Sequence, residues 1–193
     1  MNHGYMGKVL WVDLGSGRMK TETLPDRFYS DFLSGTGLAS RLLFDRIPEG
    51  ADPLGPDNIL GFVSGLLTST GTLFTGRWMV VGKSPLTNTW GDANCGGNLA
   101  PAIKQCGFDA IFFTGISKKP VYFYADTHGA KLKDAAAIWG KDTVETETIL
   151  SQKKDEEKGP VWPASDRQER SSPFWPVSAI KKGAWRPAAA WVP

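Results

Sequence analysis

The sequence contains few of the residues that build disulfide frameworks or metal centres. It has two cysteines, Cys95 and Cys106, and two histidines, His3 and His128. Two thiols cannot form a disulfide framework or a four-thiolate site on their own, so a bound metal or cluster would need ligands from elsewhere. The net charge of +2 also excludes the strongly basic character of a nucleic-acid-binding protein, so no nucleic-acid partner is expected.

Long apolar runs are also missing from the chain. No stretch approaches the roughly 20 apolar residues that a membrane-spanning helix needs. The first residues, "MNHGYMGKVLWVDL", place polar residues and an acid where a signal peptide needs an uninterrupted apolar stretch. We therefore predict a cytoplasmic protein with no membrane partner.

Glycine and short strand-forming runs are abundant in the sequence. The 22 glycines are typical of tight turns or of a ligand site lined by backbone. The elements do not follow the strict strand–helix alternation of a doubly wound fold, so we predict a strand-rich α+β fold with short helices. β-rich runs predict strands at residues 8–14, 19–24, 58–65, 77–85, 109–115 and 120–126, and helical spacing of apolar residues predicts helices at 26–33, 38–46, 98–106 and 142–150.

The segment "WGDANCGGN" sets a cysteine and a glycine pair directly ahead of a predicted helix. As a nucleophile, Cys95 would require a neighbouring base, which neither His3 nor His128 evidently supplies, and the alternative is a small buried cysteine. Gly96 and Gly97 favour an anion site, because free N–H groups and the helix dipole attract phosphate. A tight turn without any ligand explains the glycine pair equally well.

Arg77 is the best single candidate for holding a charged group. It follows the Gly/Thr-rich loop "GLLTSTGTLFTG" and precedes a predicted strand. A guanidinium group binds phosphate or carboxylate through two parallel hydrogen bonds. The alternative, a surface arginine at the start of a strand, is equally compatible with the sequence.

Several segments together resemble a known family in order and spacing. They are "YMGKVLWVDLGSG", "FLSGTGLASRLLFDRIP", "DPLGPDNIL", "GLLTSTGTLFTGRWMVVGKSPLT", "WGDANCGGNLAPAIKQCGFDAIFFTG" and "AAAIWGKDTVETE". The chain from about residue 4 to about residue 150 resembles the N-terminal domain of the aldehyde ferredoxin oxidoreductase family. The resemblance implies paired β-sheets that form a saddle under two pterin dithiolenes.

The resemblance also implies cofactors and partners. Members of this family oxidise aldehydes to carboxylates with a tungsten, or molybdenum, bis-pterin cofactor (tungstopterin), and a magnesium ion bridges the two pterin phosphates. A [4Fe-4S] cluster in the intact enzyme passes the electrons to ferredoxin. The expected partners of the intact enzyme are therefore ferredoxin and an aldehyde, and a homodimer is a further expectation.

The same resemblance assigns roles to five residues. Asn94 would offer its backbone carbonyl to the magnesium ion, and Gly96 and Gly97 would let the backbone approach the cofactor. Arg77 would lie between pterin and cluster and form hydrogen bonds there. Cys95 occupies a position that the family fills with a small residue, within the same cofactor-binding segment. No residue of this chain is expected to be catalytic, because the cluster cysteines and the aldehyde-handling residues belong to later domains of the family.

The chain is therefore expected to be the truncated cofactor-binding domain of such an oxidoreductase, inactive by itself. The alternative is a non-catalytic module that binds a pterin or another phosphate-bearing ligand, or docks on a partner. We place the pterin-binding domain at residues 1–158 and a disordered, non-family tail at residues 159–193. The tail holds four of the eight tryptophans and many prolines, and its sequence does not align with the family.

We hypothesise that a frameshift near Gly159 produced the tail. When each new codon starts at the third base of the old one, residues 160–170 permit the family segment "VASIGPAGE", and residues 185–193 permit a sequence close to "AAGRGGVGA". We predict that resequencing the gene from codon 150 past its stop reveals one inserted or deleted base that restores both segments. An unchanged frame with no family-like sequence after it would refute this prediction.

Overall fold

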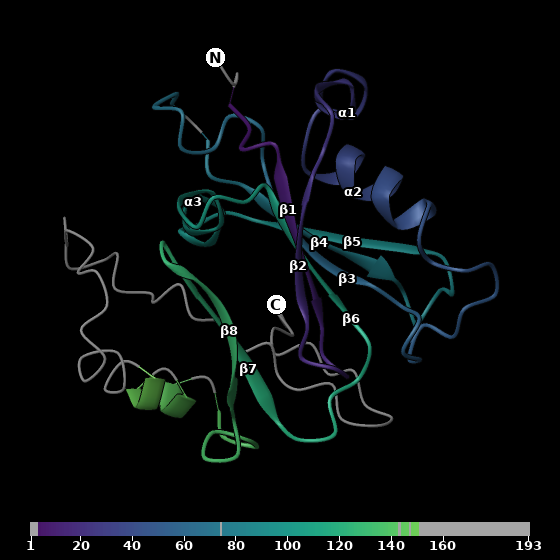
Figure 1. The fold of residues 1–193 in the computed structure, drawn as a ribbon, viewed down its shortest axis with the longest axis vertical. Coiled ribbons are helices and arrows are strands. Elements are labelled where there is room, and N and C mark those ends of the chain that lie inside the picture. Colours follow the sequence, from purple (N-terminus) through teal and green to yellow (C-terminus); the bar gives the residue numbers. More distant parts are fainter. Residues whose placement is uncertain (1–3, 74, 143, 147, 151–193) are drawn as a thin grey trace. The chain divides into compact units, whose positions relative to one another are not determined.

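Figure 1 shows the fold of the computed structural model, which describes residues 4–150 except 74, 143 and 147. The chain divides into two units, Met1–Ile116 and Ser117–Pro193. The predicted tail at residues 159–193 lies outside the described residues.

A six-stranded mixed sheet forms the first unit. Its strand order is β2-β1-β6-β3-β4-β5. β1 and β6 pair in parallel, and all other neighbours pair antiparallel. The strands are β1 Lys8–Asp13, β2 Met19–Thr23, β3 Leu60–Ser64, β4 Trp78–Lys83, β5 Trp90–Cys95 and β6 Ala110–Thr114, and the helices of this unit are α1 Asp26–Phe32, α2 Thr36–Phe44 and α3 Leu99–Gln105.

Helices cover both faces of this sheet. Leu38 and Leu42 lie one turn apart on α2 and join a core cluster that includes Val63 and Phe112 on the first face. On the opposite face, the Ser64 hydroxyl donates a hydrogen bond to the Ala100 carbonyl of α3 at 3.3 Å. The alternation of side chains along a strand therefore divides the core between α2 on one face and α3 on the other.

Gly61 allows the tight packing at the centre of the first face. A Cβ atom at Gly61 would lie 2.6 Å from the Phe112 ring and 2.7 Å from Val81, closer than real contacts allow. The Phe112 ring can therefore lie directly over the β3 backbone. On its neighbour strand, Trp11 stacks against Phe112 with ring centroids 4.5 Å apart.

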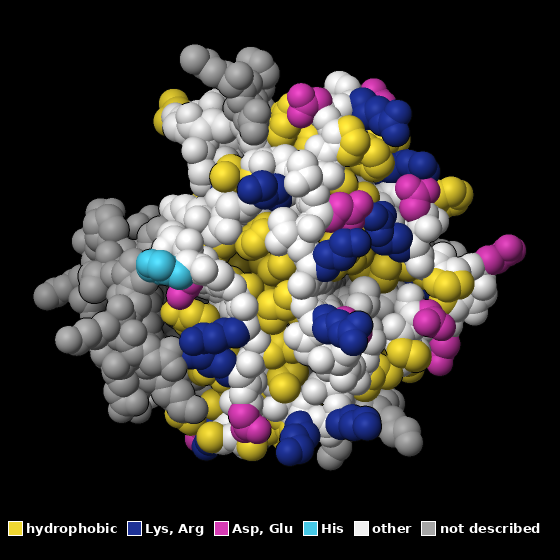
Figure 2. All heavy atoms as spheres, viewed as in Figure 1, with side chains coloured by type: hydrophobic (Ala, Val, Ile, Leu, Met, Phe, Trp, Pro, Cys, Tyr) yellow, Lys and Arg dark blue, Asp and Glu magenta, His cyan; other side chains and the backbone are white. Residues whose placement is uncertain are grey.

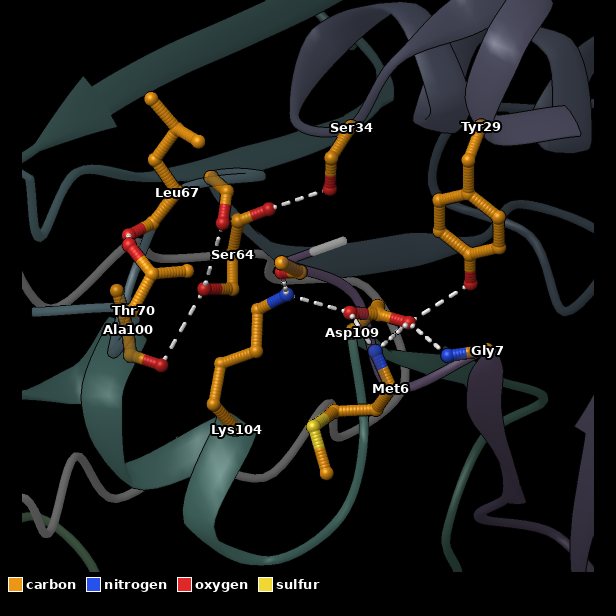
Figure 3. A network of polar contacts seen from close by, with 12 residues as sticks. Met6, Gly7, Tyr29, Ser34, Ser64, Leu67, Thr70, Ala100, Lys104 and Asp109 are labelled. Carbon is orange, nitrogen blue, oxygen red and sulfur yellow. Dashed lines mark hydrogen bonds and ion pairs between the residues drawn. The ribbon is translucent and has the colours of Figure 1, made fainter. Parts of the chain in front are cut away.

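A buried carboxylate joins several elements of the first unit (Figure 3). Asp109 is fully buried, and its two oxygens accept hydrogen bonds from the backbone N–H groups of Met6 and Gly7. The Tyr29 hydroxyl of α1 donates to Asp109 at 2.7 Å, and the Lys104 ammonium of α3 pairs with it at 2.6 Å. One side chain thus holds the N-terminal segment and two helices against the start of β6.

The charged groups of this cluster are compensated within it. Burial, and then the negative charge of Asp109, raise the pKa of the Tyr29 hydroxyl well above its ordinary value, so Tyr29 remains a hydrogen-bond donor. Lys104 also donates to the Gly4 carbonyl at 2.7 Å. Buried charges are tolerated when they are paired and hydrogen-bonded in this way.

The second unit contains a β-hairpin with a small core of its own. β7 Val121–Asp126 pairs antiparallel with β8 Gly129–Asp134. Tyr122, Ala135, Ile138 and Leu150 form its buried cluster. Residues 144–146 and 148–150 are helical, within the predicted helix at 142–150, and the Asp142 carboxylate accepts the Glu145 N–H at 2.8 Å.

The predicted α+β class and its two sheets are confirmed, with differences in the strands. The predicted strands and helices of the first unit are present with small shifts at their ends. Two strands, β5 and β8, were not predicted. β5 contains Gly91, Asp92 and Asn94, which are residue types of low strand propensity, and it forms only because β4 offers it a partner.

The face shown in Figure 2 carries charged side chains of both signs. Lys and Arg side chains are interspersed with acidic ones on this face. None of the helices in the described residues is both long and apolar enough to cross a membrane.

Replacing the buried carboxylate tests the importance of the Asp109 cluster. We expect Asp109→Asn to lower the free energy of unfolding by about 3–5 kcal/mol, because the Lys104 ammonium is left buried without its counter-charge. The matched control is Asp45→Asn, which removes an ion pair with Arg41 at the surface and should cost less than about 0.5 kcal/mol. Urea denaturation measures both values, and equal losses in the two variants would contradict the prediction.

Candidate functional site

The antiparallel pairing of β4 with β5 brings the candidate binding residues together. Trp78 lies opposite Cys95 and Met79 opposite Asn94. Arg77 directly precedes β4, while Gly96 and Gly97 directly follow β5. Residues separated by almost twenty positions in the sequence therefore meet at one end of this strand pair, although the sequence analysis assigned no strand to the second segment.

The backbone carbonyl of Asn94 faces the free edge of the sheet. β5 is the last strand, so one of its sides has no partner strand. Opposed residues in an antiparallel pair alternate between hydrogen-bonded and non-hydrogen-bonded positions. The Ser84 N–H donates to the Thr89 carbonyl at 2.8 Å, and counting from this bonded pair along the unbroken register places Asn94 opposite Met79 in a non-bonded position. The Asn94 carbonyl therefore points away from β4.

The two glycines leave open space next to this carbonyl. A Cβ atom added at Gly96 or at Gly97 would meet no atom within 4 Å. Gly97 has φ +108°, a backbone conformation that residues with a side chain rarely adopt, whereas Gly96 has no such restriction. The glycine at position 97 is therefore required by the backbone itself, and both glycines leave room for a ligand to approach the main chain.

Arg77 provides a positive charge at the same end of the strand pair. Its side chain is exposed, and among the described residues its guanidinium has no ion-pair partner. Its carbonyl accepts a hydrogen bond from the Gly65 N–H at 3.0 Å, which connects the start of β4 to the start of the Gly/Thr-rich loop. The arginine backbone is therefore held in place while its charged group remains available to an anion.

Cys95 does not have the surroundings of a nucleophile or of a core residue. Its thiol is exposed on the edge strand, so the alternative of a small buried cysteine is wrong. His128 belongs to the second unit, and His3 lies outside the described residues. The described part of the first unit therefore supplies no histidine that could act as the base for a nucleophilic Cys95.

The groups at this edge are suited to a phosphate whose charge is neutralised by a bound metal ion. An outward carbonyl oxygen suits magnesium, which prefers oxygen ligands, while an arginine and open backbone suit the phosphate oxygens. Within the described residues, no group of three or more histidine, cysteine or acidic side chains could hold a metal ion by itself. The helix dipole contributes little, because α3 has only seven residues and no side-chain cap.

Trp78 is a site residue that sequence reasoning missed. Its indole N–H donates to the Gly96 carbonyl at 3.2 Å, and its ring is buried and stacks against Phe62 with centroids 6.0 Å apart. No local pattern could have identified this contact, because it depends on the register between β4 and a strand that the sequence did not predict.

Comparisons with known proteins point to one family. Residues 9–163 match the family described as "Aldehyde ferredoxin oxidoreductase, N-terminal domain". The chain is 36% identical over 170 residues to a tungsten-containing aldehyde ferredoxin oxidoreductase of Pyrococcus horikoshii, with 86% of this chain and 28% of that protein covered. It is 30% identical over 159 residues to an aliphatic sulfonate oxidoreductase, WOR-like subunit, of Pyrococcus furiosus, with 80% of this chain and 25% of that protein covered.

A solved structure shares the fold. It is the active site complex BamBC of benzoyl coenzyme A reductase in complex with 1,5 dienoyl-CoA, which superimposes with a TM-score of 0.78 at 33% sequence identity. The match covers 82% of this chain and 24% of that one. This chain therefore spans about a quarter of the length of the proteins that it resembles.

The two neighbouring glycines provide a matched test of this geometry. Gly97→Ala should lower the free energy of unfolding by about 1–3 kcal/mol, because alanine is strained at φ +108°. Gly96→Ala should change it by less than about 1 kcal/mol in either direction, because an added methyl group meets open space and φ lies outside the left-handed region. Urea denaturation compares the two variants. Equal losses would contradict the positive φ at Gly97.

Proposed function

Because the chain belongs to the aldehyde ferredoxin oxidoreductase N-terminal domain family, we propose that it is the cofactor-binding N-terminal part of a tungsten or molybdenum pterin oxidoreductase. The observation that carries this proposal is the meeting of Arg77, the Asn94 carbonyl and the open glycine pair at one end of β4 and β5. These are the groups that the family resemblance assigns to pterin and magnesium.

Each of these residues has a distinct role in the proposed site. The Asn94 carbonyl is a ligand for the magnesium ion that neutralises the pterin phosphates. Arg77 donates hydrogen bonds to the cofactor, and Gly96 and Gly97 let the main chain come close to it. The bound metal centre supplies the two-electron chemistry, and the residues of this chain bind and orient it.

The complete reaction requires residues beyond this site. In our proposal the intact enzyme oxidises an aldehyde with water to a carboxylate, which releases two electrons and three protons, and ferredoxin is the electron acceptor. The two cysteines of this sequence cannot supply a four-thiolate cluster, so the cluster ligands belong to other segments of the enzyme. The domain boundary at residue 158, the cytoplasmic location and the homodimer remain predictions.

The names of the relatives favour an aldehyde as the substrate, although one relative is named for an aliphatic sulfonate. Tungsten-containing aldehyde ferredoxin oxidoreductases of Pyrococcus horikoshii and Pyrococcus abyssi resemble this chain, as does the aliphatic sulfonate oxidoreductase subunit. The shared part is the N-terminal quarter, so we assign to it the common task of cofactor binding. Substrate choice then depends on the rest of each enzyme.

A second candidate is a binding module without catalysis. It is favoured by the composition of the site. The candidate groups are of types that bind ligands, and among them no nucleophile is paired with a general base. Under this alternative the chain binds a pterin or another phosphate-bearing ligand, or docks on a partner. Cofactor binding combined with electron transfer to ferredoxin in the assembled enzyme would exclude it.

The contribution of Arg77 tests the proposed function. We expect the chain, purified from a host that makes the tungsten pterin cofactor, to carry pterin, and Arg77→Met to carry about tenfold less, because a charge-assisted pair of hydrogen bonds is lost. Arg41→Met removes a partly exposed arginine on α2 and should carry as much as the wild type. Fluorescence of the oxidised pterin and metal analysis give the content. Equal pterin content in both variants would refute the assigned role of Arg77.

A further inference from the structure

The peptide bond between Gly96 and Gly97 is fixed on one side by a buried tryptophan. The Trp78 indole N–H donates to the Gly96 carbonyl at 3.2 Å. A peptide bond is planar and, in this structure, trans, so the N–H of Gly97 points opposite to the carbonyl of Gly96. The bond to Trp78 therefore aims the Gly97 N–H away from the buried ring and toward the open side of the loop.

The indole has little freedom to turn. Trp78 is 5% exposed, its backbone belongs to β4, and its ring stacks on Phe62. An indole N–H can only donate, and a buried donor needs an acceptor. The Gly96 carbonyl meets this need, so the side chain and the peptide hold each other in one orientation.

The Gly97 N–H is available to a ligand in the described structure. Within the described residues it donates to no backbone or side-chain acceptor, and Gly97 is exposed with no atom within 4 Å of an added Cβ. Arg77 lies beside Trp78 in the sequence. An N–H donor and a guanidinium at one location are suited to the oxygens of a phosphate.

We propose that Trp78 is a positioning residue that holds the Gly96–Gly97 peptide so that the Gly97 N–H donates to a phosphate oxygen of the ligand. This inference rests on the proposed function, because the ligand is the phosphate-bearing cofactor of that site. Trp78 acts through the peptide and does not touch the ligand. Its substitution therefore changes the orientation of a donor, in addition to any effect on packing.

The test uses the full 193-residue chain labelled with nitrogen-15 glycine and titrated with magnesium pyrophosphate. In the wild type, we expect the amide signal of Gly97, assigned by its loss in Gly97→Ala, to shift and saturate. Trp78→Phe keeps an aromatic ring but loses the indole N–H, and we expect its dissociation constant to rise about tenfold. Even without ligand, the Gly97 amide signal of Trp78→Phe should be displaced from its wild-type position. The amide signal of Gly61 in the core should stay at its wild-type position.

Two further variants separate positioning from packing. Phe112→Leu loses a buried ring on the opposite face of the sheet but keeps Trp78 and its stacking on Phe62, so its dissociation constant should stay within about twofold of the wild type. Replacing Trp78 with the sulfur isostere β-(3-benzothienyl)alanine removes the N–H without changing the ring shape. It should reproduce the tenfold loss and the displaced Gly97 signal even if Trp78→Phe folds poorly.

The outcomes distinguish the two hypotheses. An unchanged Gly97 signal and an unchanged dissociation constant in the sulfur isostere would overturn the role of Trp78. A wild-type chain that does not bind magnesium pyrophosphate would instead count against the phosphate site of the proposed function. In that case the Gly97 signal measured without ligand decides whether Trp78 orients the peptide. A displaced signal in the isostere variant supports this role of Trp78, and an undisplaced signal overturns it.

Discussion

The ion pair between Asp109 and Lys104 is the interaction on which the rest of the first unit depends. The carboxylate lies where β6 begins and accepts hydrogen bonds from the N-terminal segment, from α1 and from α3. These elements cover different faces of the sheet, so no single hydrophobic layer could hold them together. A buried charge of this kind is costly unless every partner is present, and this requirement makes the arrangement specific.

The sheet that this cluster anchors has two different edges. β2 carries Lys20 and Glu22, charged residues of the kind that protect an edge from pairing with other chains. β5 has a single charge, Asp92, and leaves its outward carbonyls available. In the proposed function this edge is covered by the cofactor, which explains why an exposed strand end, two glycines and an arginine gather there. The same edge would be an aggregation hazard in a chain without its ligand.

In the proposed function, binding and chemistry lie in separate parts of the enzyme. The described site offers backbone groups and one guanidinium, which are suited to holding a charged ligand in a fixed orientation. It offers no paired acid and base. The relatives, about four times longer than the region that matches, act on an aldehyde or an aliphatic sulfonate according to their names. A common N-terminal binding platform with substrate chemistry placed elsewhere is consistent with that range.

The sequence alone determined the fold class, most strands and helices, and the residues to examine at the site. Strand alternation, helical spacing and turn residues are local signals, and they located α2, α3 and β6. The pattern of β8, with Ala130 and Leu132 alternating with lysines, was also a usable signal that was not recognised. Arg77, Asn94 and the glycine pair were selected by motif, a property of the chain that needs no coordinates.

Only the tertiary structure decided how these residues act together. The outward carbonyl of Asn94 and the bond from Trp78 to Gly96 both follow from the register of β5, a strand that its own residues do not favour. The Asp109 cluster joins Met6 and Asp109 across 103 positions, and Tyr29 and Asp109 across 80. Contacts between such distant residues depend on how whole elements pack. A local pattern carries no record of that packing, because each side chain reaches its partner only after the sheet has formed.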